Sequence, residues 1–212
     1  MADIPESVPY LLFLLAYDTN RGRLTSRLEL RYLISAGALT ELLLAGHITD
    51  MGGKIRVRES TEPTDPVLAA FLARIAETRP RSWQHWLKRG SRTLPGEIRA
   101  GLADRGVIRL ERHRILGIAP VTRVTVPDVL TVKRLAERVP AALSENRPAS
   151  RVAPRDAALV SLSAQAELKT VMPRSRRRAH KVRIAELGDV AEPVPRALRR
   201  AIREARSAAG GG

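Results

Sequence analysis

The sequence predicts a mainly α-helical fold with two short β-hairpins. Apolar stretches carry helix start and stop signals, and the order helix–glycine–hairpin occurs twice. Hydrophobic residues make up 44% of the 212 residues, which is enough for a buried core in one domain or in two small ones. Because aromatic residues make up only 3%, we expect an aliphatic core, with Trp83 and Trp86 anchoring helix packing from one helix face.

The first third of the chain carries helix and hairpin signals in succession. Ser26 and Glu29 have the spacing of a capping box, and Gly46 lies where the helix that they begin would end. The following residues alternate around Gly52 and Gly53, which is typical of a β-hairpin. The expected elements are an apolar helix over 9–17, a polar turn over 18–22, a helix over 28–45 and a hairpin over 47–57.

Proline and glycine divide the middle of the chain. Pro95 is favoured at the first position of a helix, so we expect one helix to end before it and another to begin there. Gly106 ends this second helix, and residues 107–126 predict another hairpin. Helix–glycine–hairpin thus occurs at 28–58 and 95–126, which indicates two similar units around one helical core. The expected helices cover 67–77, 81–89, 95–105 and 127–138.

Three prolines between residues 140 and 154 predict a loop or linker before the last part of the chain. Three helices are expected to follow it, and a short glycine-containing tail is expected to be flexible. These segments are helices over 154–171, 173–187 and 193–207 and a tail over 208–212.

The formal net charge of +15 is unevenly distributed along the chain. Residues 1–78 hold 8 Lys and Arg against 10 Asp and Glu. Residues 79–114 hold 10 against 3, and residues 174–212 hold 11 against 4. An even compositional bias would not leave the first third slightly acidic. The charge therefore favours an anionic partner, which could be nucleic acid, lipid headgroups or an acidic protein.

The sequence lacks the common motifs of catalysis. It has no Gly-rich phosphate loop, no Gly-x-Ser-x-Gly and no His-Glu-x-x-His, and its four histidines are dispersed. The absence of cysteine excludes disulfides, thiolate metal sites and cysteine nucleophiles, and it is typical of a reducing compartment. Glu41, within an apolar run, is either a functional acid or, as we favour, an arginine partner or an outward-facing side chain. We expect no enzymatic activity, no metal and no cofactor.

The sequence also predicts no membrane-crossing segment. The apolar run Val8–Tyr17 has ten residues, about half of a bilayer span. Asp3 and Glu6 lie where a secretory signal would carry positive charge, so we expect no such signal.

The basic segment 79–114 leads directly into the second hairpin, whose tip over 115–121 is apolar. Arg112, Arg114 and Arg123 flank this tip. Apolar residues that enter the headgroup region, with cations at the level of the phosphates, are typical of an interfacial anchor. Five such cations near an anionic bilayer would contribute about 5 kcal/mol. An inward-facing strand under the helices is an equally weighted alternative.

Nucleic acid is the competing partner class. A helix, a glycine and a basic hairpin also make a winged helix-turn-helix, with 95–105 as the recognition helix and 107–126 as the wing. The candidate recognition helix has no Asn, Gln or Lys for base edges, and the scarcity of aromatic residues disfavours single-strand stacking. A membrane surface is therefore the favoured partner.

Several motifs, taken in order, resemble the Golgi phosphoprotein 3 family in the short form found in actinobacteria. The resemblance extends over essentially the whole chain and depends on the order and spacing of the motifs. The motifs are Leu11–Leu15 with the Gly22 turn, Ser35–Gly46, Glu62–Leu68, Trp83–Leu87, Leu102–Ile108, Arg155–Val160 and the basic run Arg176–Arg183.

The resemblance implies a single domain over 1–207 with a helical-bundle core. It also implies a peripheral membrane protein that binds phosphatidylinositol 4-phosphate and inserts the hairpin at 107–126. The family's headgroup site has a Trp and three Arg, which align with Ser26, Ser35, Arg92 and Pro95, so only Arg92 is kept. Candidate headgroup-binding residues are Arg27, Arg31, Ser35, Arg89 and Arg92, and candidate residues of the inserting hairpin are Arg114, Ile115, Leu116, Ile118, Val121 and Arg123.

We therefore expect a cytoplasmic protein that binds reversibly to the inner face of a membrane through anionic phospholipid. Recognition of anionic phospholipids in general is favoured over strict specificity for phosphatidylinositol 4-phosphate. A winged-helix nucleic-acid-binding protein and a lipid-docked protein adaptor are the alternatives. A protein cargo and self-association are both compatible with the sequence.

Overall fold

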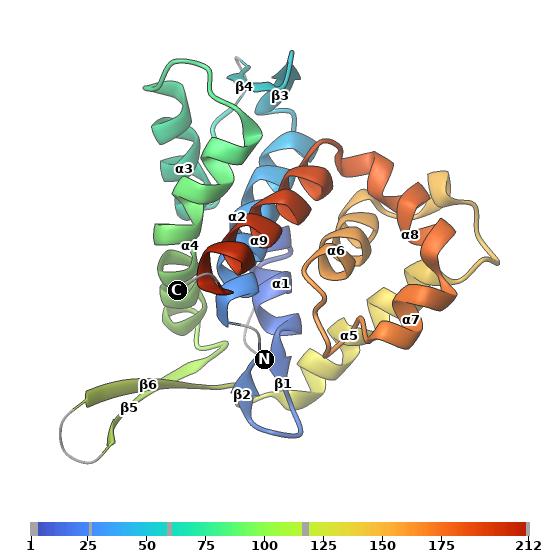
Figure 1. Ribbon diagram of the computed structural model, residues 1–212. Helices are drawn as coiled ribbons and strands as arrows, with labels where there is room; N and C mark the ends of the chain where they lie inside the picture. Colours follow the sequence, from blue (N-terminus) through green and yellow to red (C-terminus); the bar gives the residue numbers. More distant parts are fainter. Residues whose placement is uncertain (1–3, 26, 59–60, 116–118, 211–212) are drawn as a thin grey trace.

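The computed structural model describes residues 4–25, 27–58, 61–115 and 119–210 and has a mainly helical fold (Figure 1). Three two-stranded antiparallel sheets accompany the helices in this part of the chain. The helices are α1 Val8–Leu15, α2 Arg27–Leu44, α3 Pro66–Ala76, α4 Trp83–Asp104, α5 Val129–Leu143, α6 Pro154–Gln165, α7 Arg174–Ala179, α8 Lys181–Gly188 and α9 Val194–Gly210. The strands are β1 Tyr17–Asp18, β2 Arg23–Leu24, β3 Ile48–Met51, β4 Lys54–Val57, β5 Arg109–Ile115 and β6 Ala119–Thr125, and short 3₁₀ helices cover Ala149–Arg151 and Asp189–Ala191.

Helix α1 lies at the centre of the fold, and every one of its residues is buried. A helix that is apolar all round is stable only when other elements cover it, and α2, α4, α5 and α6 do so. Gly37 permits the close approach of α2. A Cβ at this position would lie 2.9 Å from the Leu12 Cδ1 atom and 3.0 Å from the Pro9 Cα atom. The apolar helix predicted over 9–17 is therefore confirmed, although it ends at Leu15 and Tyr17 begins β1.

The two tryptophans pack in the interior, as predicted. Trp83 and Trp86 are both buried, and the Phe71 ring meets the Trp86 ring edge-on at a centroid distance of 6.0 Å. The Trp83 indole N–H donates to the Asp50 carboxylate, which ties α4 to the first hairpin. These contacts place both side chains in the packed interior.

Both predicted hairpins are present, and they lie at opposite ends of the molecule (Figure 1). Gly52 and Gly53, with φ of 60° and 78°, turn β3 into β4. Gly46 and Gly106, with φ of 78° and 68°, follow α2 and α4 in the left-handed conformation that favours glycine. The Ser26 half of the expected capping box lies outside the described residues. The helix–glycine–hairpin order therefore occurs twice, and α2 and α4 pack on each other.

The expected break before Pro95 is wrong, because α4 continues through it. A proline inside a helix leaves the carbonyl four residues earlier without its N–H donor. That carbonyl belongs to Ser91, and it accepts a hydrogen bond from the Arg31 Nε atom at 3.2 Å. A side chain from α2 thus replaces the missing donor. A winged helix needs a separate recognition helix over 95–105, so that alternative loses its structural basis.

Three other expected boundaries are also corrected. Helix α5 continues through Pro140 to Leu143, because its apolar face is buried on both sides of the proline. The expected helix over 173–187 is divided at His180, whose φ of −110° and ψ of 31° are not helical. Helix α9 runs to Gly210, past the expected end at residue 207.

Ion pairs hold the outer face of α9 against α4. The Lys88 Nζ atom lies 2.8 Å from the Glu204 Oε2 atom, and the Arg200 Nε atom lies 2.9 Å from Glu204 Oε1. Hydrogen bonds from Lys88 and then Arg200 lower the pKa of Glu204 from 4.5 to about 2. A carboxylate whose pKa is lower in the folded than in the unfolded protein stabilises the fold at pH values above its unfolded pKa. This contribution is lost as the pH falls toward the folded pKa.

We expect Glu204→Gln to reduce the acid sensitivity of the protein between pH 4.5 and pH 2. The free energy of unfolding from urea titrations should therefore differ between wild type and variant above pH 4.5, and the difference should shrink as the pH falls. Glu77→Gln is the control, because Glu77 is exposed and has no ion pair within the described part of the chain. An identical pH profile for wild type and Glu204→Gln would contradict this prediction.

Candidate functional site

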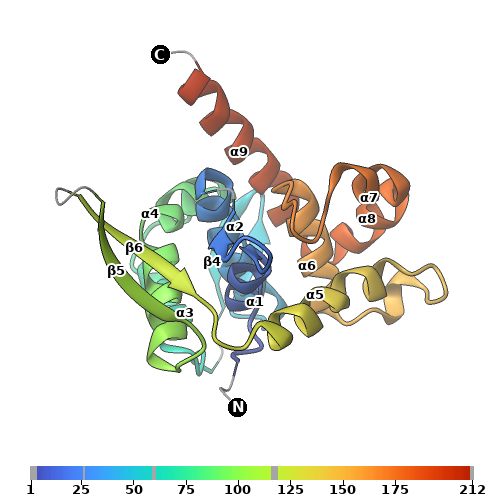
Figure 2. The ribbon, with the colours of Figure 1, turned by 90° about the horizontal axis from the view of Figure 1, so that it is seen from below.

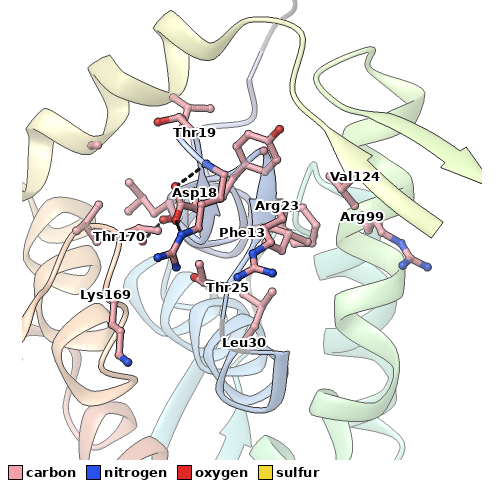
Figure 3. Close-up of a pocket in the computed structure, with 18 of the residues that line it drawn as sticks. Phe13, Asp18, Thr19, Arg23, Thr25, Leu30, Arg99, Val124, Lys169 and Thr170 are labelled. Carbon is pink, nitrogen blue, oxygen red and sulfur yellow. Dashed lines mark hydrogen bonds and ion pairs between the residues drawn. The ribbon is translucent and has the colours of Figure 1, made fainter. Parts of the chain in front are cut away.

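A basic cavity of about 1690 Å³ opens at the end of the molecule that carries β5 and β6. The β1–β2 turn, the first turns of α2, the middle of α4, strand β6, helix α5 and residues 169–171 form its walls. Figure 3 shows some of the lining side chains, which come from elements far apart in the sequence. Its cationic lining residues are Arg21, Arg23, Arg31, Arg99, Arg123, Lys133 and Lys169.

Asp18 is the acidic residue in the described lining, and it shapes the β1–β2 turn. Its Oδ1 atom accepts hydrogen bonds from the backbone N–H groups of Asn20 and Arg21, both at 3.0 Å. Its Oδ2 atom lies 3.8 Å from the Arg21 Nε atom. Asp18 therefore offsets part of the charge of Arg21, and the cavity keeps a strong positive excess.

The bottom of the cavity includes the C-terminal end of α1, where helix carbonyls lack partners from the helix itself. The Thr25 hydroxyl donates to the Ala16 carbonyl at 3.0 Å, and the Thr170 hydroxyl donates to the Leu15 carbonyl. Phe13 and Leu30 add apolar surface beside these threonines (Figure 3). These carbonyls therefore have hydroxyl groups as hydrogen-bond donors. The charge of the cavity is determined by its cations.

Two arginines of the lining, Arg31 on α2 and Arg99 on α4, differ in their hydrogen bonding. The Arg31 Nε atom is used by the Ser91 carbonyl, so this guanidinium has only its terminal N–H groups for a ligand. The Arg99 Nε atom is buried and has no hydrogen-bond partner in the described part of the chain. A buried donor without a partner is unfavourable.

Of the headgroup residues expected from the sequence, Arg31 is the one in the described lining of the cavity. Arg31 lines the cavity, whereas Arg92 and Arg89 lie outside the lining on the exposed side of α4. The Arg89 guanidinium lies over the Trp86 ring at 5.7 Å. Ser35 has an exposed fraction of 0% and donates to the Trp86 carbonyl at 3.4 Å, so it cannot reach a headgroup. Nothing is described for the side chain of Arg27, which begins α2.

The hairpin residues expected to enter a membrane are only partly described. Arg123, at the base of β6, lines the cavity. Arg114, Ile115 and Val121 belong to the paired strands, but only their backbone is described. Leu116 and Ile118 lie outside the described residues, so membrane insertion by this hairpin stays a prediction. The described strands extend away from the helices (Figures 1 and 2).

Several cavity residues were not identified from the sequence. Arg21 and Arg23 come from the β1–β2 turn, Arg99 from α4, Lys133 from α5 and Lys169 from the segment after α6. In the sequence alone, none of these cations differs from an ordinary surface Lys or Arg, and no regular spacing links them. Their grouping depends on how the helices pack.

The comparison with family models supplies the family. The model of the Golgi phosphoprotein 3 family (GPP34) matches residues 9–205. The chain belongs to this family. Among curated proteins, none matches the sequence. The resemblance found from the motifs is therefore confirmed over almost the whole chain.

No helix in the described part of the chain is long and apolar enough to span a bilayer. The described residues also contain no cluster of three or more metal-ligating side chains. The basic cavity is the candidate site of this family member.

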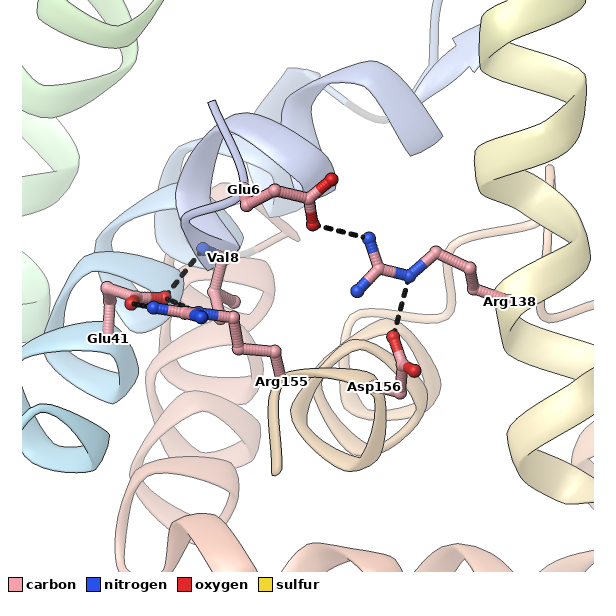
Figure 4. Close-up of polar contacts among 6 residues, drawn as sticks. All are labelled: Glu6, Val8, Glu41, Arg138, Arg155 and Asp156. Atoms are coloured by element: carbon pink, nitrogen blue, oxygen red, sulfur yellow. Dashed lines mark hydrogen bonds and ion pairs between the residues drawn. The ribbon is translucent and has the colours of Figure 1, made fainter. Parts of the chain in front are cut away.

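Glu41, the unusual carboxylate of the sequence, has a structural role (Figure 4). Its Oε1 atom accepts from the Arg155 Nη2 atom at 2.6 Å, and its Oε2 atom accepts from the Val8 backbone N–H at 2.9 Å. It thereby satisfies one of the free N–H groups at the start of α1. The favoured reading of Glu41 as an arginine partner is confirmed.

A second carboxylate–arginine cluster lies nearby. The Arg138 side chain bonds Glu6 at 2.8 Å and Asp156 at 2.7 Å, which joins α5 and α6 to the residues before α1 (Figure 4). Despite its partial burial, the hydrogen bonds that Arg138 donates to these carboxylates keep the pKa of Arg138 above its ordinary value.

Proposed function

We propose that this protein is a peripheral membrane protein that binds anionic phospholipid headgroups in the basic cavity. The observation that carries the proposal is the grouping of seven cations, from six separate parts of the fold, around one cavity with a single acidic residue in its described lining. Lys and Arg form charge-assisted hydrogen bonds with phosphate oxygens, and Arg can do so in a bidentate manner. Family membership supports the same partner class, since phosphatidylinositol 4-phosphate is the ligand that the resemblance implies.

The location of the cavity also supports a membrane surface. It opens at the end from which the β5–β6 hairpin extends, and Arg123 belongs to both features. A headgroup in the cavity and an apolar hairpin tip in the bilayer would therefore act together. Reversible association with the inner face of a membrane follows from the same proposal, and a lipid-docked adaptor with a protein cargo is compatible with it.

Co-sedimentation with vesicles tests the proposal. Wild type should bind phosphatidylcholine vesicles that contain an anionic phospholipid, and it should not bind vesicles of phosphatidylcholine alone. The variant Arg23→Gln with Lys133→Gln should bind the anionic vesicles about 30-fold more weakly. Each cation near an anionic surface contributes about 1 kcal/mol, so two contribute about 2 kcal/mol.

The matched control is Lys54→Gln with Arg56→Gln, which removes the same charge from β4 at the opposite end. An equal loss of binding in this control would mean that net charge, and not the cavity, determines binding. Equal binding of wild type to neutral vesicles, or none to anionic vesicles, would overturn the proposal.

Vesicles of matched charge identify the headgroup preference. We expect phosphatidylinositol 4-phosphate and phosphatidylglycerol to support similar binding. The family's tryptophan position is Ser26 here, and two of its arginine positions are Ser35 and Pro95. A strong preference for the inositol lipid would instead mean that other residues recognise that headgroup.

A further inference from the structure

Leu130, at the start of α5, has an apolar side chain that is exposed to solvent. Its exposed fraction is 65%, which is unusual for a large aliphatic residue in this protein. The Asp128 Oδ1 atom accepts from the Thr131 backbone N–H at 3.1 Å, and this cap fixes the first turn of the helix. Leu130 is therefore presented by a well-defined helix end.

The outer face of α5 combines this leucine with positive charge. Leu130, Lys133 and Arg134 are exposed and have the i, i+3 and i+4 spacing of one helix face. The opposite face, with Val132 and Leu135, is buried in the core. This face thus combines an apolar residue with two cations, the combination that binds at an anionic bilayer surface.

Helix α5 and the β5–β6 hairpin border the same cavity. Lys133 on α5 and Arg123 on β6 both line it, and only residues 126–128 separate the two elements. Seen from below in Figure 2, the hairpin extends to one side of α1 and α5 extends to the other. Leu130, three residues before Lys133 on α5, therefore lies at the cavity end of the molecule.

We propose that Leu130 is a second apolar contact with the anionic bilayer, on the opposite side of the cavity from the hairpin. This inference rests on the proposed function. Lys133 and Arg134 lie at the level of the lipid phosphates when Leu130 enters the interface. A hairpin alone leaves the body free to tilt about one point, whereas a second contact fixes the cavity mouth against the headgroups.

The absence of cysteine from the sequence permits a direct test. Leu130→Cys is labelled with an environment-sensitive fluorophore and mixed with phosphatidylcholine vesicles that contain phosphatidylglycerol. We expect a blue shift in emission and quenching by lipids that carry a spin label near the headgroup. Met51→Cys is the matched control, because Met51 is 52% exposed and lies on the opposite hairpin, so its label should not change.

A second variant measures the contribution of Leu130 to binding. Leu130→Asp should weaken binding to the same vesicles by about tenfold or more and leave thermal stability unchanged, because the side chain is exposed. Val182→Asp is the control, since Val182 is 72% exposed on α8 and does not line the cavity.

The outcomes separate this inference from the proposed function. If unlabelled wild type does not bind the anionic vesicles, the proposed function fails. If wild type binds while the label at position 130 behaves like the label at position 51, or Leu130→Asp binds like wild type, the second contact is overturned and the cavity proposal stands.

Discussion

Replacement of both Leu116 and Ile118 by aspartate is expected to reduce binding to anionic vesicles by at least two orders of magnitude. Full burial of one such aliphatic side chain contributes about 1.5–3 kcal/mol, so two contribute about 3–6 kcal/mol. The new carboxylates would also be repelled by anionic headgroups and would be unfavourable in an apolar interface. Co-sedimentation or a fluorescence titration measures this loss.

The control for this variant is Met51→Asp with Val57→Asp. These residues are exposed apolar side chains of the β3–β4 hairpin at the opposite end of the molecule, so binding should not change beyond the small effect of charge. Leu116→Asn with Ile118→Asn separates the loss of apolar burial from charge repulsion. Wild-type affinity in the aspartate variant would show that the hairpin tip does not enter the bilayer.

Glu41→Ala is expected to lower the free energy of unfolding by about 3 kcal/mol. Glu41 is almost completely buried, and it bonds both Arg155 and the Val8 backbone N–H. Its loss leaves a buried N–H without a partner and an arginine without its carboxylate, and the disruption of a buried pair typically costs 3–5 kcal/mol. The lower end applies because the Arg155 side chain is about half exposed and water can solvate it.

Glu97→Ala is the matched control for burial. Glu97 pairs with Arg74 through two hydrogen bonds of 3.0 and 2.9 Å, but both side chains are about one-third exposed. The expected loss is about 1 kcal/mol or less. Urea denaturation of both variants checks the difference. A Glu41→Ala variant as stable as Glu97→Ala would mean that the contact with Val8 contributes little.

Features with local signals were predictable from the sequence. Gly46, Gly52, Gly53 and Gly106 all have positive φ, and each lies at the helix end or turn that its spacing predicted. The buried helix α1 was also predictable from the apolar run at 9–17, because a helix that is apolar all round requires burial on every side.

Features that depend on distant partners were not predictable. Pro95 breaks a helix unless another donor serves the Ser91 carbonyl, and that donor, Arg31, lies 60 residues earlier in the chain. Pro140 likewise remains helical because α5 buries an apolar face. The basic cavity could be anticipated only as an excess of charge. Its cations range from Arg21 to Lys169, and their proximity is a result of packing.

The hydrogen bond between Arg31 and Ser91 has a consequence for the thermodynamics of ligand binding. Immobilisation of a flexible side chain on association typically costs about 0.5–1.5 kcal/mol in lost rotamer entropy. Because the Arg31 Nε atom is already bonded to the Ser91 carbonyl, much of its ordering occurs on folding. Its guanidinium plane is therefore preorganised before a phosphate arrives. If the cavity binds headgroups as proposed, the proline within α4 would contribute indirectly to that affinity.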